Sequence, residues 1–109
     1  MSKILKVLSE KKVLNEKSEQ TSRLDKDTLF EFYAPSAEDV RVVGSFNNWN
    51  PSGHVLRKDP NGRWRLVIKL KPGRYEYRYK VDGNWQNDQR PVACVPNAFG
   101  TWNCVVEVS

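Results

Sequence analysis

The stretch RYEYRYKV, residues 74–81, constrains the fold of this chain more than any other part of it. Apolar or aromatic side chains alternate with charged ones at every position. The three tyrosines and Val81 therefore share one face of an extended segment, and the arginine, glutamate and lysine side chains share the other. A period of two predicts a β-strand with one face in a core and the other in water.

The same period runs through the chain from Thr28 onward, in short segments rich in β-branched and aromatic residues. Turn sequences such as PNGR and VDGN separate these segments. The segments expected to form strands are 29–34, 39–46, 54–59, 63–70, 74–81, 84–87 and 103–108. Their number and spacing predict an all-β fold, an immunoglobulin-like β-sandwich, although the pattern alone leaves a barrel open as the alternative. A length of 109 residues fits one such domain.

Residues 1–27 differ from the rest, because they contain no aromatic residue, no glycine and no proline. Aliphatic residues between Ile4 and Leu14 fall roughly on one helical face, which is compatible with a short amphipathic helix that would be marginal in isolation. We therefore divide the chain into an N-terminal extension, 1–27, and a β-sandwich module, 28–109. The extension is expected to be flexible or partly helical, either as a mobile tail or as a segment that docks on a partner.

The charge of the chain is positive but scattered. The total is +5, and residues 28–109 carry only a small basic excess without a basic stripe. This distribution argues against nucleic acid as the main partner. The beginning, MSKILKVLSEKK, has no apolar run of signal-peptide length, and no later segment approaches a membrane span. We expect an intracellular, cytoplasmic protein with no membrane partner.

Alternation sorts two of the four tryptophans into the core. Trp64 shares its strand face with Leu66 and Leu70, so a structural role is expected. Trp102 alternates in the same way with Cys104, and packing is the favoured interpretation there too. The two cysteines lack the CxxC and histidine spacing of a zinc site, and they are too few for a disulfide scaffold. We expect reduced thiols and no metal.

Trp85 belongs to the opposite face. If Asp82 and Gly83 are the central residues of a tight hairpin turn, Trp85 lies directly opposite Lys80 and near Arg78. A tryptophan on that outer face forgoes the stabilisation of roughly 25 cal/mol that each Å² of buried apolar surface would provide. A second role is therefore expected for its ring.

Trp49 raises the same question, because the loop GSFNNWNP, residues 44–51, offers no alternating strand to bury it. The bland alternative is a tryptophan that folds back over one end of the sandwich. Two tryptophans outside the core pattern, each flanked by amide side chains, fit a sugar better. The apolar face of a pyranose ring matches a flat aromatic ring, and its hydroxyls match amide and guanidinium donors.

Three motifs in this order, VRVVGSFNNWNP, YEYRYKVDGNWQND and PNAFGTWNCVVEV, resemble a family 48 carbohydrate-binding module. This family includes the glycogen-binding domain of AMP-activated protein kinase beta subunits and the N-terminal domains of branching and debranching enzymes. The resemblance covers about residues 28–109. It implies an early-set, immunoglobulin-like β-sandwich that binds α-1,4-linked glucans such as glycogen and starch.

The resemblance also implies roles for individual residues. Two tryptophans of the family stack on consecutive glucose units and align with Trp49 and Trp85. Arg78 stands where kinase-type modules carry a lysine that bonds sugar hydroxyls, and the change turns a compact donor into a planar fork. The remaining predicted contacts align with Phe99, Thr101 and Asn103. Phe99 stands where kinase subunits carry leucine, and in this respect the loop resembles the enzyme-linked modules.

Catalysis is not expected, because the chain offers no constellation for it. His54 is the only histidine, and a solvated or strand-flanking role suits it. Asp82 and Asp88 form no convincing glycosidase pair, because the first suits the turn and the second a loop. No phosphate-binding loop or serine-nucleophile motif occurs. We expect no enzyme activity and no cofactor.

The sequence thus predicts a non-catalytic module that binds α-glucan polysaccharide or oligosaccharide. The alternative is a protein-interaction or regulatory early-set domain whose glucan site is vestigial. A third hypothesis, single-stranded nucleic-acid binding, has exposed aromatics in its favour and the small net charge against it. The extension, 1–27, is a candidate for docking on a glucan-active enzyme or on a kinase-type assembly.

Overall fold

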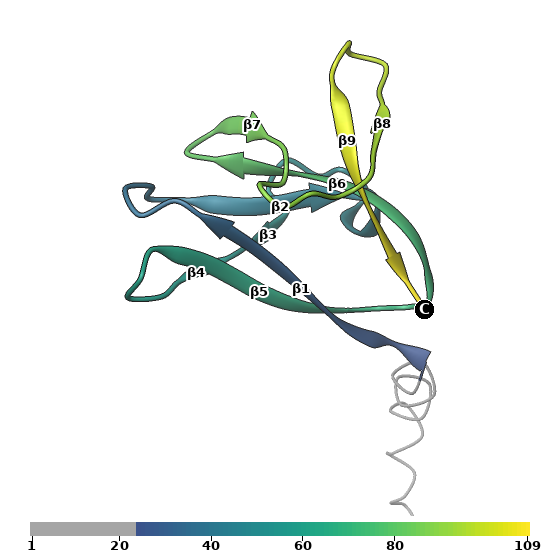
Figure 1. Cartoon of the computed structure of the whole chain (residues 1–109), viewed down its shortest axis with the longest axis horizontal. Helices are drawn as coiled ribbons and strands as arrows, with labels where there is room; N and C mark the ends of the chain where they lie inside the picture. Colours follow the sequence, from purple (N-terminus) through teal and green to yellow (C-terminus); the bar gives the residue numbers. More distant parts are fainter. Residues whose placement is uncertain (1–23) are drawn as a thin grey trace, which may run out of the picture.

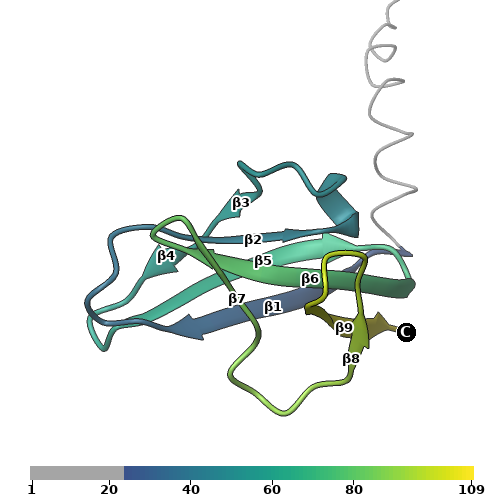
Figure 2. The ribbon, with the colours of Figure 1, turned by 90° about the horizontal axis from the view of Figure 1, so that it is seen from above.

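The structure, a computed structural model, describes residues 24–109 as two antiparallel sheets packed face to face (Figures 1 and 2). The small sheet has the order β1 (Lys26–Tyr33), β5 (Arg63–Leu70) and β4 (Arg57–Lys58). The large sheet has the order β3 (His54–Val55), β2 (Val40–Gly44), β6 (Gly73–Val81), β9 (Trp102–Val108) and β8 (Cys94–Pro96), with β7 (Asn84–Gln86) paired to β6. The predicted β-sandwich is confirmed, since no strand pair in residues 24–109 joins the two sheets into a barrel.

The N-terminal boundary of the β part lies slightly earlier than the sequence pattern suggested. β1 begins at Lys26, which pairs with Leu70, and Asp27 pairs with Lys69. Residues 1–23 lie outside the described part of the chain. The expected helix or docking segment within 1–27 therefore stays a prediction.

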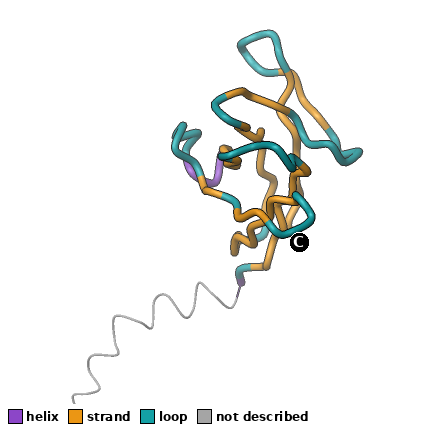
Figure 3. The backbone as a smooth tube through the Cα atoms, turned by 90° about the vertical axis from the view of Figure 1, so that its left-hand side faces the viewer, coloured by secondary structure: helices purple, strands orange, loops and turns teal. Residues whose placement is uncertain are grey.

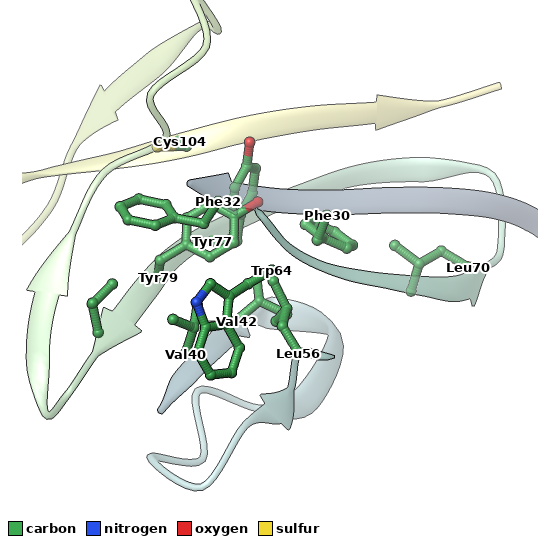
Figure 4. Close-up of a cluster of buried hydrophobic side chains, with 11 residues drawn as sticks. Phe30, Phe32, Val40, Val42, Leu56, Trp64, Leu70, Tyr77, Tyr79 and Cys104 are labelled. Carbon is green, nitrogen blue, oxygen red and sulfur yellow. The ribbon is translucent and has the colours of Figure 1, made fainter. Parts of the chain in front are cut away.

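The core lies between the sheets, where the alternation predicted it (Figure 4). Tyr77 and Tyr79 of β6 are buried against Phe30 and Phe32 of β1, with ring centroids 5.2 and 5.0 Å apart in the pairs Phe30–Tyr77 and Phe32–Tyr79. Trp64 is buried, and its indole N–H donates to the carbonyl oxygen of Ala34 at 2.8 Å. Its predicted structural role is confirmed, because both its apolar rings and its polar atom are satisfied inside the protein.

The segment HVLRKD does not form the single strand that was expected. His54 and Val55 pair with β2 in the large sheet, whereas Arg57 and Lys58 pair with β5 in the small sheet. Leu56 stands between the two short strands, where the chain passes from one sheet to the other, and it is 2% exposed. Its burial explains the split, because the crossing point must carry an apolar side chain into the core.

The hairpin between β6 and β7 has the predicted register. Lys80 pairs with Trp85, and both central residues, Asp82 and Gly83, have positive φ angles of 47° and 84°. Two left-handed central residues are typical of a turn that matches the twist of a hairpin. The Asp82 carboxylate also accepts hydrogen bonds from the backbone N–H groups of Glu38 and Asp39, both at 2.9 Å. Asp82 is therefore a structural residue of the turn.

Two further elements escaped the pattern. β8 is only three residues long and includes Pro96, so it shows no alternation. The 3₁₀ turn η1 (Ser45–Asn47), drawn purple beside the sandwich in Figure 3, follows β2 directly. β8 forms an edge of the large sheet, and the loop that follows η1 carries Trp49, so both elements shape the candidate site.

Candidate functional site

The outer face of the large sheet carries the basic residues of β6 and the ring of Trp85. Trp85 is 42% exposed. The guanidinium carbon of Arg78 lies 5.9 Å from the ring centroid of Trp85, and the Lys80 ammonium lies 5.4 Å from it. Cations at this distance are attracted to the indole ring and help to fix its orientation. Trp85 is thus held in place on the outer face without being buried.

Trp49 reaches the same face from the loop after η1, through an unusual backbone. Asn48 and Trp49 are both left-handed, with φ angles of 58° and 56°. A bulky residue in this region costs on the order of 1–3 kcal/mol, and such strain persists only where the surroundings fix it. The Trp49 N–H donates to the carbonyl oxygen of Gly44 at 2.9 Å, which closes the loop. The chain therefore accepts local strain to aim this one side chain.

Asn47 fixes the loop that carries Trp49. Its amide oxygen accepts from the Gly44 N–H at 2.9 Å, and its amide nitrogen donates to the Val42 carbonyl at 3.2 Å. The same nitrogen lies 2.9 Å from Nδ1 of His54. Because an amide nitrogen only donates, Nδ1 must accept, so the proton of the neutral imidazole lies on Nε2. His54 is the first residue of β3 and pairs with Val42, so it lies within a strand and does not flank one. It also supports the Trp49 loop, which the sequence did not reveal.

The loop between β8 and β9 forms the third side of the candidate site, beside Trp85 and the Trp49 loop. Hydrogen bonds of Asn97 hold this loop together. The amide oxygen of Asn97 accepts from the backbone N–H groups of Phe99 and Thr101, at 3.0 and 3.1 Å. Its amide nitrogen donates to Oδ1 of Asn103 and to Oγ1 of Thr101, both at 2.8 Å. Phe99, at the tip, is 89% exposed. Asn97 was missed by the sequence reasoning, although its place two residues before Phe99 is typical of an Asx turn.

Arg78 joins the central strand to the surrounding loops. Its Nε donates to Oδ1 of Asn87 at 2.7 Å, and its Nη1 donates to Oγ1 of Thr101 at 3.3 Å. An arginine has five N–H donors. Three of them are therefore without a partner among residues 24–109. Asn103 is buried, by contrast, and its amide nitrogen donates to Oε1 of Glu76 at 3.1 Å.

These segments enclose one groove of about 670 Å³ on the outer face. Its lining consists of Trp49, Arg78, Trp85, Asn97, Phe99, Thr101 and Asn103. The six residues singled out from the sequence thus lie together, and Asn97 is added to them. The groove combines two indole rings and an exposed phenyl ring with amide, hydroxyl and guanidinium groups, so it can offer apolar contact and hydrogen bonds to the same ligand.

Trp102 is a correction to the sequence reasoning. It shares a strand face with Cys104 as the alternation predicted, but it is 53% exposed. The hairpin formed by β8 and β9 extends beyond the small sheet (Figure 1), so the packing partner that the pattern implied is missing at that end. The prediction of structural packing for Trp102 is wrong, and the residue does not line the groove.

The surroundings of Asp88 give it a structural role. Its side chain is fully buried, and its carboxylate accepts from the Tyr77 hydroxyl at 2.6 Å and from Nη2 of Arg90 at 2.9 Å. Burial by itself would raise the pKa of Asp88, but the hydrogen bonds from Arg90 and Tyr77 outweigh it and hold the pKa below its usual value. A carboxyl group kept ionised in this way is not suited to general acid catalysis.

Comparison with known families assigns this chain to a class of carbohydrate-binding modules. Residues 16–98 match the family described as carbohydrate-binding module 48 (isoamylase N-terminal domain). The chain belongs to this family. The matched range begins at residue 16, within the segment expected to lie outside the module.

Three relatives illustrate where such modules occur. Protein FLOURY ENDOSPERM 6, chloroplastic, of Oryza sativa subsp. japonica is 30% identical over 77% of this chain and 17% of its own length. Protein PTST homolog 2, chloroplastic, of Arabidopsis thaliana is 41% identical over 52% of this chain and 11% of its own length. The 1,4-alpha-glucan branching enzyme GlgB of Rhodopseudomonas palustris (strain BisB5) is 39% identical over 64% and 10%, respectively. The chain therefore spans only a small part of the curated relatives that it matches.

Two expectations about location meet different findings. No helix within residues 24–109 is long and apolar enough to cross a membrane. The names of two relatives place those proteins in chloroplasts. The expected cytoplasmic location accordingly stays a prediction.

Proposed function

We propose that this module binds α-1,4-linked glucan, with Trp49 and Trp85 stacking on sugar rings along the groove. The observation that carries the proposal is the convergence of both tryptophans and Arg78 on one groove of the uncovered sheet face. Family membership points to the same class of ligand. So does the name of one relative, a 1,4-alpha-glucan branching enzyme.

The two kinds of contact have separate tasks. The indole rings cover the apolar faces of the sugars, which supplies affinity through burial and dispersion. Arg78 directs its unpartnered N–H groups at sugar hydroxyls. The Thr101 hydroxyl, which bonds both Arg78 and Asn97, orients the guanidinium from the loop between β8 and β9. Asn103 and Asn97 hold that loop in shape, and Phe99 closes the groove at its tip. The groove is open, and an uncharged ligand gains little from the charge of Arg78, so a single sugar segment should bind weakly. Overall binding should therefore depend on the many equivalent sites along a glucan polymer.

The module is a binding domain, and it has no catalytic role in this proposal. In a branching enzyme the corresponding region is one part of a much longer chain. We therefore propose that the domain brings glucan to an activity located elsewhere, with the extension that precedes β1 as the segment that contacts such a partner and the β-sandwich as the glucan module. A kinase-type assembly, considered from the resemblance, has no support in the relatives described above.

Isothermal titration with linear malto-oligosaccharides tests the proposal. The wild-type protein should bind, and Trp49→Ala and Trp85→Ala should each lose about tenfold or more in affinity, as expected for central aromatic contacts. Trp102→Ala is the matched control, because Trp102 is an exposed tryptophan outside the groove. Thermal unfolding of all variants verifies that they fold.

Two outcomes would overturn the proposal. Undetectable binding by the folded wild-type protein would favour the vestigial, protein-interaction alternative. Equal loss in Trp102→Ala and in the groove variants would show that the effect is not local to the groove. A salt series completes the test, because glucan binding should barely respond to salt, whereas nucleic-acid binding weakens steeply.

A further inference from the structure

Cys94 and Cys104, the only cysteines of the chain, lie directly opposite each other on neighbouring strands. Cys94 belongs to β8 and Cys104 to β9, and the register pairs them with each other. Directly opposed residues point to the same face of a sheet. The two thiols are therefore neighbours on the inner face of the large sheet, a pairing of residues ten positions apart that no sequence motif predicted.

The hydrogen-bond pattern shows which kind of pair this is. The N–H of Val105 donates to the carbonyl oxygen of Ala93 at 2.9 Å, so Ala93 and Val105 are a hydrogen-bonded pair. Such pairs alternate with non-hydrogen-bonded ones along an antiparallel ladder, which makes Cys94 and Cys104 a non-hydrogen-bonded pair with Cα atoms about 4.5 Å apart. That separation lies at the short end of the range of about 4.4–6.8 Å that a disulfide spans.

The two thiols differ in access. Cys94 is exposed on β8, an edge strand of the large sheet. Cys104 is buried, and its sulfur accepts a hydrogen bond from the backbone N–H of Asp88 at 3.2 Å. Burial raises the pKa of the Cys104 thiol. In a thiol–disulfide exchange, Cys94 is therefore suited to attack an external disulfide, because it is accessible from solvent. Cys104 is suited to resolve the resulting mixed disulfide, because it can reach only its neighbour.

We infer that Cys94 and Cys104 form a reversible cross-strand disulfide by exchange with a small oxidised disulfide such as oxidised glutathione. The Cys94 thiolate attacks one sulfur of glutathione disulfide, forms a mixed disulfide and releases one glutathione thiolate. The Cys104 thiolate then attacks the Cys94 sulfur and releases the second glutathione. The protein loses two protons and two electrons, and the two electrons reduce glutathione disulfide to two glutathione thiols.

The bond is positioned to act on the groove. It would link the two strands at the base of the hairpin whose loop carries Phe99 and Thr101. In the thiol form this hairpin is held by a strand of only three residues, β8, at the edge of the sheet. The cross-link would remove freedom from the loop between β8 and β9 before a ligand arrives. Part of the ordering cost of binding would then be met in advance.

Equilibration in buffers of reduced and oxidised glutathione, followed by acid quenching, alkylation and intact mass measurement, tests the disulfide. The wild-type protein should lose two hydrogen atoms and resist alkylation in oxidising buffer, and it should regain both thiols in reducing buffer. Cys94→Ser should show neither change. Cys104→Ala should stop as a mixed disulfide of glutathione on Cys94, since the resolving thiol is gone.

The result that overturns the inference is a wild-type protein that keeps two alkylatable thiols, or accumulates the mixed disulfide, in fully oxidising buffer. Should Cys104→Ala fail to fold, peptide mapping of wild-type protein quenched early in the reaction replaces it, and glutathione found on Cys104 instead of Cys94 would refute the assigned order of attack.

The effect on glucan rests on the proposed function, whereas the disulfide itself does not. Titration of oxidised and reduced wild-type protein with the same malto-oligosaccharide should give roughly threefold tighter binding in the oxidised form, which corresponds to one side chain fewer to order on binding. Equal affinities would overturn the coupling. Absence of binding in both forms would overturn the proposed function, while the mass measurement would still decide the disulfide.

Discussion

The two faces of β6 differ in what their side chains leave unsatisfied. On the inner face, Tyr77 and Tyr79 are buried, and both hydroxyl groups have partners: Tyr77 donates to Asp88, and Tyr79 accepts from the N–H of Glu31. On the outer face, Arg78 keeps free donors, and Trp85 on the paired strand keeps an exposed ring. Residues adjacent in sequence thus alternate between groups satisfied inside the protein and groups left free on its outer face.

This difference suggests that stability and ligand affinity can be changed separately in one strand. A satisfied, buried group contributes to the free energy of unfolding, and its loss leaves a cavity. An exposed group with free donors contributes little to that free energy, and its unused bonding capacity is available to a ligand. The following variants test how complete the separation is, from the largest expected effect to the smallest.

Tyr79→Ala should have the largest effect, on stability. Removal of a fully buried aromatic side chain should lower the free energy of unfolding by about 3–5 kcal/mol. Urea denaturation measures it, with Lys80→Ala, its neighbour on the outer face, as the matched control that should change stability by less than about 0.5 kcal/mol. Comparable losses in the two variants would break the distinction between the faces.

Asp88→Asn should destabilise the protein by about 1–3 kcal/mol at neutral pH, because the buried Tyr77 hydroxyl and the partly exposed Arg90 guanidinium lose an anionic partner. The pKa of Asp88 is lowered in the folded protein, so the unfolded state binds the proton more readily. This contribution to stability is therefore fully present above the ordinary aspartate pKa of about 3.9 and is lost as the pH falls through the lower, folded value.

Urea midpoints for wild-type and Asp88→Asn protein across the acid range measure the effect. The difference between the two proteins should shrink as the pH falls through that window. A difference that stays constant down to the most acidic point would show that the charge of Asp88 is not its source.

Asn47→Ala should lower both the free energy of unfolding and the affinity for glucan, since Asn47 fixes the loop that carries Trp49. Loss of its bonds to Gly44, Val42 and His54 should cost about 1–2 kcal/mol of stability and free the strained Trp49 loop, which weakens glucan binding. Asn50→Ala, in the same loop, is the control, because its side chain bonds only the nearby Ser52 N–H in the described structure. Binding would be expected to survive in that control. Full affinity in Asn47→Ala would show that the loop holds Trp49 without it.

Arg78→Lys should have the smallest effect. Lysine retains a cation near Trp85 but loses the fork that bonds Asn87 and Thr101 together. Affinity for malto-oligosaccharide should fall by a few fold, with the melting temperature nearly unchanged. Arg74→Lys, on the same face but outside the groove, provides the comparison by titration. A complete loss of binding in Arg78→Lys would mean that the fork itself is indispensable.

The sequence predicted those parts of the molecule that depend on local pattern. The alternation of residues 74–81 fixed the inner face of β6, and the Asp82–Gly83 turn fixed the position of Trp85. The division of HVLRKD between two sheets was not predictable, because Leu56 crosses into a core that only the packed sheets define. The exposure of Trp102 had the same origin, since alternation gives a direction and not a neighbour.

The site shows the same limit. The tryptophans and Arg78 were recognised through motifs, and their role in binding remains a prediction. Asn97 and Asn47 were missed as supports, because their importance lies in bonds to backbone groups, whose positions depend on strained or irregular loops. An asparagine in a loop has many uses, and only the surrounding geometry selects one.

The order of the large sheet also bears on how the chain reaches its final form. β9 pairs with β6 and β8, so a strand late in the sequence occupies the interior of the sheet. Until β9 is made, the edge of β6 from Gly73 to Tyr77 has no partner, because β7 pairs only with the far end of the strand, Tyr79–Val81. An unpaired edge invites association with other chains. A growing polypeptide would therefore be most vulnerable to aggregation between the synthesis of β6 and that of β9, and the groove on the outer face would be among the last features to form.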